Sequence, residues 1–141
     1  ARGLGDVYKR QHIKRELIKP TKIYVKEILE LNKKNLINGC ANITGGGLIE
    51  NLRRVIPEKS TLNIDLGKVK ITNIFKWLKK NNIKDKEMLS TFNCGVGFCL
   101  IVNKKNIKKI TNIFSKTYKP YPIGFVSDEK FKYKLYGKLK W

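Results

Sequence analysis

The residues best suited to chemistry are three consecutive glycines, Gly45, Gly46 and Gly47, between an alternating segment and a helical one. Without a Cβ, such a turn accepts positive φ angles and lets a ligand approach the backbone closely. Because the turn leads into a helix, it directs backbone N–H groups and the positive end of the helix dipole at one point. This arrangement suits an anion such as phosphate. A tight turn without a ligand fits the spacing equally well, and no Lys-Ser or Lys-Thr pair follows, as a GxxxxGK[ST] loop requires.

Three polar residues accompany the glycines. Thr44 is predicted to offer its hydroxyl, beside the backbone N–H groups of the loop, to phosphate oxygens. Glu50 and Asn51 lie in the first turn of the following helix, where they would orient a ligand or the loop. Their simpler role is to stabilise the helix start.

A second glycine-containing segment is TFNCGVGFCLIV, Thr91–Val102. Both alternating faces are apolar from Cys94 onward, which predicts a central strand buried on both sides. Gly95 and Gly97 lie on one face, where bare backbone admits a ligand or another segment of the chain. Asn93 precedes them and offers an amide to a ligand. In the alternative interpretation the glycines admit a packed helix and Asn93 caps a turn.

No metal site and no catalytic residue are predicted. Cys94 and Cys99 fall on opposite faces of the expected strand, so they cannot share a metal. The three cysteines lack CxxC spacing and are expected to be buried and reduced. His12 is the only histidine and lies in a poorly patterned start, where we expect a solvated side chain.

The chain is strongly basic: 31 Lys and Arg against 11 Asp and Glu give a net charge of +20. This charge alone suggests a nucleic-acid or acidic-membrane partner. However, the excess positive charge comes mostly from lysine and is spread along the chain. Abundant Lys, Asn and Ile are also typical of an A+T-rich coding sequence. We therefore expect a largely solvated basic surface and no nucleic-acid partner. No apolar run spans a bilayer and no secretory leader is visible, so we expect no membrane partner and a cytoplasmic location.

The periodicity predicts a helix that opens at Pro20 with Thr21 as N-cap, followed by elements in the order β-α-β-α-α-β-α-β-β. This order predicts an α/β (α+β) sandwich with a mixed β-sheet packed against helices. In the last strand Phe131, Tyr133 and Leu135 alternate with lysines, which predicts an edge strand with one wet face. Residues 1–16 are expected to be a disordered or non-native leader, and residues 17–141 one domain.

Three motifs resemble the phosphoribosylformylglycinamidine cyclo-ligase (aminoimidazole ribonucleotide synthetase) family. They are PTKIYVKEILEL (Pro20–Leu31), ITGGGLIENLRRVIP (Ile43–Pro57) and EMLSTFNCGVGFCLIV (Glu87–Val102). The resemblance runs from about Leu17 to near the C-terminus and covers the C-terminal half of such an enzyme. It implies the C-terminal domain fold of the aminoimidazole ribonucleotide synthetase-like superfamily.

The resemblance also implies an activity. The family uses ATP to convert formylglycinamidine ribonucleotide to aminoimidazole ribonucleotide, ADP and phosphate in purine biosynthesis, as a cytoplasmic homodimer. ATP and Mg²⁺ are expected mainly in an N-terminal half, so this chain is expected to be a partial enzyme, inactive alone. The glycine loop would bind substrate phosphate, and Asn93, Gly95 and Gly97 would line the same cleft.

One residue departs from the family pattern. The position before the hydrophobic-Thr-Gly-Gly-Gly run is usually histidine, and here it is Asn42. Asparagine can hydrogen-bond a substrate but cannot act as a general base near neutral pH.

Three other interpretations remain. One is another ATP-using member of the superfamily, such as the amidotransferase synthetase of the preceding purine step or selenophosphate synthetase. The chain is alternatively a basic nucleic-acid-binding module, or a regulatory domain that keeps the fold without catalysis.

Overall fold

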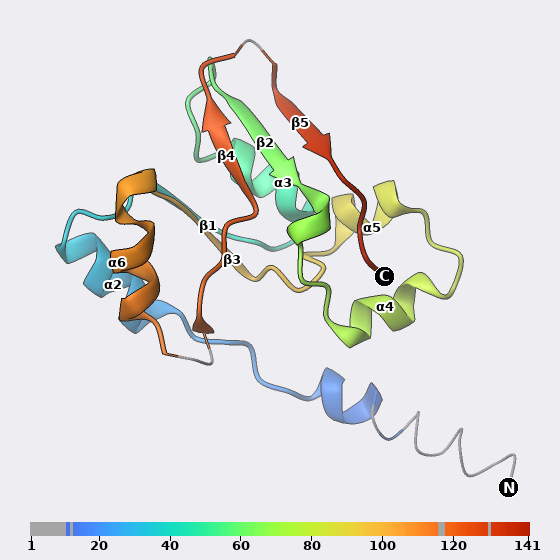
Figure 1. Ribbon diagram of the computed structural model, residues 1–141. Coiled ribbons are helices and arrows are strands. Elements are labelled where there is room, and N and C mark those ends of the chain that lie inside the picture. Colours follow the sequence, from blue (N-terminus) through green and yellow to red (C-terminus); the bar gives the residue numbers. More distant parts are fainter. Residues whose placement is uncertain (1–10, 12, 116–117, 130) are drawn as a thin grey trace, which may run out of the picture.

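The computed structural model describes residues 11, 13–115, 118–129 and 131–141. Figure 1 shows two separate groups of strands with helices around them. The named helices and strands are, in chain order, α2 (Val25–Lys33), β1 (Gly39–Asn42), α3 (Gly47–Arg53), β2 (Thr61–Asp65), η1 (Leu66–Lys68), α4 (Asn73–Lys79), α5 (Asp85–Thr91), β3 (Phe98–Ile101), η2 (Lys104–Asn106), α6 (Ile107–Ile113), β4 (Gly124–Ser127) and β5 (Tyr133–Tyr136). From β1 onward, the α-helices and strands follow the order expected from the periodicity.

The strands form one mixed sheet and one antiparallel pair. In the order β4-β2-β5, β2 runs antiparallel to β4 and parallel to β5. The remaining strands, β1 and β3, pair with Asn42 opposite Phe98 and Gly39 opposite Ile101. The expected mixed sheet packed with helices is therefore present, and the predicted α/β class is confirmed.

The prediction of a central strand over Thr91–Val102 is wrong. Only Phe98–Ile101 is a strand, and among the described residues it pairs with β1 alone. The preceding residues form a turn in which Cys94 has φ 50° and Gly95 has φ 102°. The side-chain oxygen of Asn93 accepts the Gly95 N–H at 3.0 Å, which holds this turn. The strand buried on both faces is instead β2.

The core consists of two apolar clusters. The larger cluster joins β1, α3 and β2 and includes Ile43, Leu48, Leu52, Leu62 and Ile64. The smaller cluster joins α2 to α6 through Leu31, Leu36 and Ile110. Figure 1 shows α2 and α6 together at one end of the β1–β3 pair, with α4 and α5 toward the other end. The junction of β1 with α3 therefore belongs to the larger core.

The N-terminal part differs from the expectation in one respect. The helix expected from Pro20, with Thr21 as N-cap, begins only at Val25, with Tyr24 as its N-cap residue. Residues 13–17 are helical, and Figure 1 shows this short helix set apart from the other elements. Most of the expected leader, residues 1–10, and His12 lie outside the described residues. The expectation of a leader stays a prediction.

The last strand is an edge strand, as predicted, because β5 pairs only with β2 among the described residues. The prediction of a single wet face is wrong, since all four of its residues are exposed. Tyr133 and Leu135 lie beside Leu62 and Ile64 in register, on the side of the larger core. An edge strand has a neighbour on one side only, which leaves these side chains partly open to solvent.

Candidate functional site

The glycine loop is a tight turn with one packed side and one open side. Gly46 and Gly47 have φ angles of 88° and 65°, a region that favours glycine. A Cβ on Gly47 would lie 1.9 Å from the carbonyl oxygen of Leu89, so α3 begins in close contact with α5. At Gly45, in contrast, a Cβ would meet nothing within 4 Å. The loop therefore presents open backbone at Gly45.

Asn51 holds the loop from inside. Its side chain is 6% exposed and its amide nitrogen donates to the carbonyl oxygens of Gly47 at 2.7 Å and Gly45 at 3.2 Å. The same nitrogen lies 3.4 Å from the Thr44 carbonyl oxygen. Asn51 therefore orients the loop, and its predicted contact with a ligand stays a prediction.

Glu50 lies beside the loop on the exposed side. Its carboxylate forms an ion pair with Arg54 one turn later in α3. A Cβ on Gly46 would lie 2.3 Å from the Glu50 Oε2 atom, so the carboxylate covers Gly46. A carboxylate in the first turn stabilises the helix start. It also repels an anion, which leaves Thr44 and Gly45 as the part of the loop better suited to phosphate.

One backbone hydrogen bond joins the two glycine segments. The N–H of Ile43 donates to the carbonyl oxygen of Gly97 at 2.9 Å and continues the β1–β3 ladder by one residue. On the other side of the loop, a Cβ on Gly47 would lie 3.2 Å from the carbonyl oxygen of Phe92. The glycine loop therefore lies directly beside the segment Asn93–Gly97.

The two glycines of the second segment have protein neighbours. A Cβ on Gly95 would lie 2.9 Å from the Lys70 carbonyl oxygen and 2.9 Å from Thr72 Cγ2. A Cβ on Gly97 would lie 2.5 Å from the Tyr24 hydroxyl. Packing explains both glycines, although their neighbours are loop and helix-cap residues instead of the packed helix that the alternative interpretation named; Asn93 holds the turn, as that interpretation expected. A contact between these residues and a ligand stays a prediction.

Two predicted side chains are available at the surface. Asn42 and Thr44 are both exposed, and neither side chain has a hydrogen-bond partner among the residues that the structure describes. Asn42 lies opposite Phe98 across the β1–β3 pair. These two groups and the backbone at Gly45 can donate hydrogen bonds to a bound anion.

The sequence interpretation missed Tyr24 as a neighbour of this site. Its ring packs against Phe98 with centroids 5.2 Å apart and against Tyr118 at 6.1 Å. Burial, followed by the nearby Tyr118 and Cys99, raises the pKa of the Tyr24 hydroxyl. Tyr24 falls within the helix expected from Pro20, and its contact with Gly97 was not predictable because it joins segments far apart in the chain.

The cysteines are all free. Cys94 and Cys99 are buried, but Cys40 is exposed, so the expectation of three buried cysteines is wrong for Cys40. Cys40 alternates with the buried Ala41, which places it on the outer face of β1. Burial, with a smaller contribution from Asp85, raises the pKa of Cys94 to about 11, and burial raises that of Cys99 to about 12. Both thiols are poor nucleophiles at neutral pH.

The donor groups of the described residues do not fit a metal ion. Within those residues, no group of three or more His, Cys, Asp or Glu side chains lies close enough to hold one. None of the helices in the described part of the chain has the length and apolar character needed to cross a membrane. The described residues of the site therefore offer hydrogen-bond donors and an open stretch of backbone at Gly45.

Comparison with known proteins gives one family. The sequence matches the family described as AIR synthase related protein, C-terminal domain, over residues 2–135. Similar curated proteins include the phosphoribosylformylglycinamidine cyclo-ligases of Bacillus cereus strain G9842 (45% identity over 102 residues), Bacillus cytotoxicus (45% over 111) and Streptococcus pneumoniae serotype 4 (42% over 113). These alignments cover 72%, 77% and 79% of this chain, but 30%, 32% and 33% of the relatives. The chain thus spans about a third of the length of the relatives it matches.

Proposed function

The chain belongs to the family of AIR synthase related proteins, C-terminal domain, and from this premise we propose that it acts as part of a phosphoribosylformylglycinamidine cyclo-ligase. The reaction would convert formylglycinamidine ribonucleotide and ATP to aminoimidazole ribonucleotide, ADP and phosphate. The relatives that share 42–45% identity with the chain carry this enzyme's name.

In this proposal the chain supplies one wall of the substrate cleft. Thr44 and the backbone of Gly45 bind the substrate phosphate, and Asn42 donates its amide to a polar group of the substrate. Asn93, with the backbone at Gly95 and Gly97, extends the wall. The open space at Gly45 supports this role, as do the exposed side chains of Asn42 and Thr44, which have no hydrogen-bond partner within the described part of the chain.

The chain would contribute to the reaction by positioning the substrate. A phosphate held by preorganised N–H and O–H donors fixes the substrate relative to the reacting groups. Within the proposed wall, Asn42 cannot titrate near neutral pH, and we assign it no proton transfer. ATP and Mg²⁺ would be handled by parts of the enzyme that correspond to the remaining length of the relatives, and the homodimer also belongs to that whole enzyme.

The single observation that carries the proposal is the Ile43–Gly97 hydrogen bond. It places two of the three motifs side by side in space, although about fifty residues separate them in the chain. The open loop at Gly45 then lies at their junction.

A chimaeric enzyme tests the proposal. Residues 17–141 would replace the matching part of the Bacillus cereus relative, and release of ADP would be measured with formylglycinamidine ribonucleotide as substrate. We expect activity above the background without substrate. In that chimaera, Gly45→Val is expected to lower kcat/KM at least about tenfold by blocking phosphate, because fixed geometry contributes strongly to such reactions.

The matched control is Thr21→Val, an exposed residue before α2. It is expected to leave kcat/KM within about twofold. A folded chimaera without substrate-dependent ADP release would overturn the catalytic assignment. Equal kcat/KM for Gly45→Val and Thr21→Val would overturn the proposed wall. Strong retention of random-sequence DNA at physiological salt would instead favour a nucleic-acid-binding module.

A further inference from the structure

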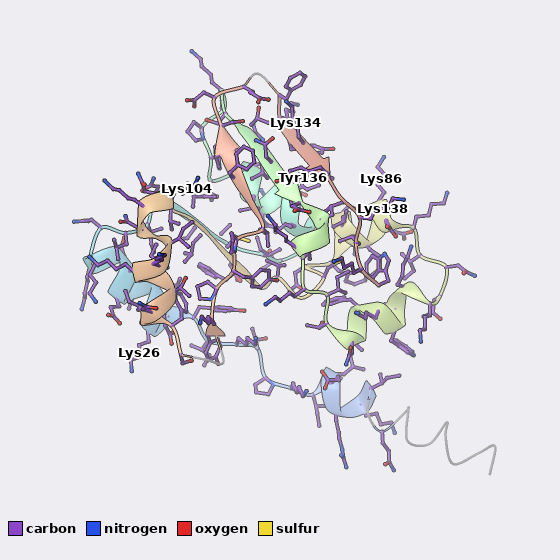
Figure 2. All side chains as sticks on the ribbon, in the orientation of Figure 1. Lys26, Lys86, Lys104, Lys134, Tyr136 and Lys138 are labelled. Carbon is purple, nitrogen blue, oxygen red and sulfur yellow. The ribbon has the colours of Figure 1, made fainter. Side chains whose placement is uncertain are left out.

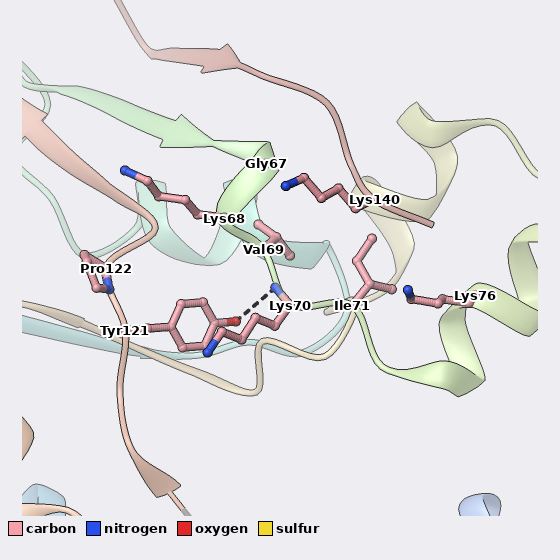
Figure 3. A pocket seen from close by; sticks show the side chains of 9 residues that line it. All are labelled: Gly67, Lys68, Val69, Lys70, Ile71, Lys76, Tyr121, Pro122 and Lys140. Atoms are coloured by element: carbon pink, nitrogen blue, oxygen red, sulfur yellow. Dashed lines mark hydrogen bonds between the residues drawn. The ribbon is translucent and has the colours of Figure 1, made fainter.

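A pocket away from the glycine loop is lined by a high proportion of lysines. It has a volume of about 540 Å³ and lies where the end of β2 meets the segment before β4 and the C-terminal segment (Figure 3). Its lining comes from four separate parts of the chain: Gly67, Lys68, Val69, Lys70, Ile71, Lys76, Tyr121, Pro122 and Lys140. We call it the lysine pocket. None of its residues belongs to the proposed substrate wall.

The charge of the lining exceeds what the composition explains. Lys and Arg make up 31 of 141 residues, so nine residues taken at random would include about two. The lining has four lysines and no Asp or Glu. Like charges that share a concave surface repel one another, and the concavity concentrates their field. A bound anion relieves that repulsion.

Most of these ammonium groups are not neutralised by the protein. Lys76 and Lys140 have no ion-pair partner among the described residues. Lys70 lies over the ring of Tyr121, with its Nζ 4.5 Å from the centroid. Among the described residues, Lys68 is the one lysine of this lining with an ion pair, to Asp65 Oδ2 at 3.5 Å. At least two lysines are therefore available to phosphate oxygens.

The rest of the lining is apolar and well supported. Val69 is buried, and Ile71, Pro122 and the Tyr121 ring add apolar surface. The Tyr121 hydroxyl accepts the Lys70 N–H at 3.2 Å, as the dashed line in Figure 3 shows. Behind the pocket, the Lys70 carbonyl packs against Gly95. These contacts fix the walls before a ligand binds.

From this arrangement we propose that the lysine pocket binds a small molecule that carries two or more phosphate groups on an apolar body. The lysines of the rim neutralise the phosphates, and the apolar wall contacts the organic part. The site is a wide-open depression of about 540 Å³, so a ligand bound there keeps part of its surface in solvent. The inference does not depend on the proposed cyclo-ligase activity, because its residues and its ligand test are separate.

Calorimetric titration of the full chain with ADP and with pyrophosphate, at physiological salt, tests the proposal. The pocket variant is Lys76→Gln with Lys140→Gln. The control is Lys104→Gln with Lys105→Gln, two exposed lysines of η2 with no ion pair among the described residues. Both pairs remove the same charge. We expect the pocket variant to weaken ADP binding about tenfold, because two charge-assisted contacts are lost, and the control to weaken it less than twofold.

Three results would overturn the proposal: absence of ADP binding to the unmodified chain, equal weakening in both variants, or binding of ADP no tighter than that of pyrophosphate. A single-stranded oligonucleotide provides a further arm. If it binds more tightly than ADP and both variants weaken it equally, the lysines act as a general polyanion surface, which also overturns a small-molecule pocket. None of these results would change the conclusion drawn from substrate-dependent ADP release by the chimaera.

Discussion

The glycines of the two motifs are explained in different ways. Gly47 is required because it packs tightly against α5, and Gly97 is required because the Tyr24 hydroxyl lies against it, but neither reason applies to Gly45. Glycines that look alike in the sequence are therefore present for different structural reasons. Only Gly45 is free of a structural explanation, which is why the proposed phosphate contact is centred there.

A pair of alanine variants separates these roles. Gly47→Ala places a Cβ 1.9 Å from the Leu89 carbonyl oxygen at a φ of 65°. We expect it to lower the free energy of unfolding by about 2 kcal/mol or more. Gly45→Ala meets open space and is expected to change stability by less than about 1 kcal/mol. Urea unfolding followed by circular dichroism measures both, and equal losses would contradict the packing described for Gly47.

The buried thiols predict a pH dependence of stability. In the unfolded chain Cys94 and Cys99 titrate near 9, and in the folded chain their pKa values are about 11 and about 12. Between these limits the folded state holds more protons than the unfolded state, so stability is full below pH 9 and falls as pH rises toward 12. Urea unfolding from pH 8 to 10.5 measures the slope.

The control for that slope is the double variant Cys94→Ala with Cys99→Ala, in which the loss of stability above pH 9 is expected to be smaller. A thiol reagent at pH 8 provides a second measurement. Only Cys40 is exposed, so one thiol is expected to react rapidly in the folded chain and three after unfolding. Rapid reaction of all three without denaturant would contradict the burial of Cys94 and Cys99.

At the scale of elements, Thr61 fixes the edge of the mixed sheet. Its hydroxyl lies 2.6 Å from the Phe131 carbonyl oxygen and 2.8 Å from that of Glu129, and it accepts the Phe131 N–H at 3.0 Å. The side chain is fully buried. This one residue of β2 therefore holds the segment that leads into β5.

Thr61→Val keeps the shape and removes the hydroxyl. Because the Phe131 N–H loses this acceptor, we expect the free energy of unfolding to fall by about 1–3 kcal/mol. Hydrogen exchange of β5 amides is expected to accelerate in the same variant. The exposed Thr21→Val is the control, with little expected change; a similar loss in both variants would show that the hydroxyl does not hold β5.

The sequence predicted the order and types of these elements, because apolar periodicity reports which face of each element meets the core. The family resemblance carried by the three motifs is also confirmed. The ends of elements were less predictable. Helix α2 begins only after Tyr24, whose ring packs on the distant Phe98, and β3 is shortened by the local turn that Asn93 holds, which an alternation of apolar residues does not reveal. The loop-holding role of Asn51 was one of several possibilities until the structure showed its amide nitrogen facing the carbonyl oxygens of Thr44, Gly45 and Gly47.

At the scale of the whole molecule, the basic charge is distributed widely. Figure 2 shows labelled lysines on elements far apart in the fold, from Lys26 of α2 and Lys104 of η2 to Lys134 of β5 and Lys86 of α5. The net charge of +20 makes the compact state repel itself. The lysine pocket is a local concentration on this general background.

Salt is therefore expected to stabilise the chain. Raising NaCl from 20 mM to 500 mM shortens the screening length several-fold and is expected to raise the melting temperature by a few degrees. Differential scanning calorimetry measures the shift. The variant with Gln at Lys104, Lys105, Lys108 and Lys109 reduces the net charge from +20 to +16 (20 − 4) and is expected to show a smaller shift. A fall in melting temperature with salt would contradict general repulsion.

The hydrogen bond between Ile43 and Gly97 has an evolutionary consequence. It continues the β1–β3 register in which Asn42 lies opposite Phe98. The glycine loop after β1 and the Asn93 turn before β3 therefore both depend on this single register. Deleting or inserting a single residue in either stretch would slip that pairing and turn outward side chains inward. We infer that both stretches keep fixed lengths as sequences diverge, whereas length variation is tolerated at exposed connections such as Asn81–Lys84.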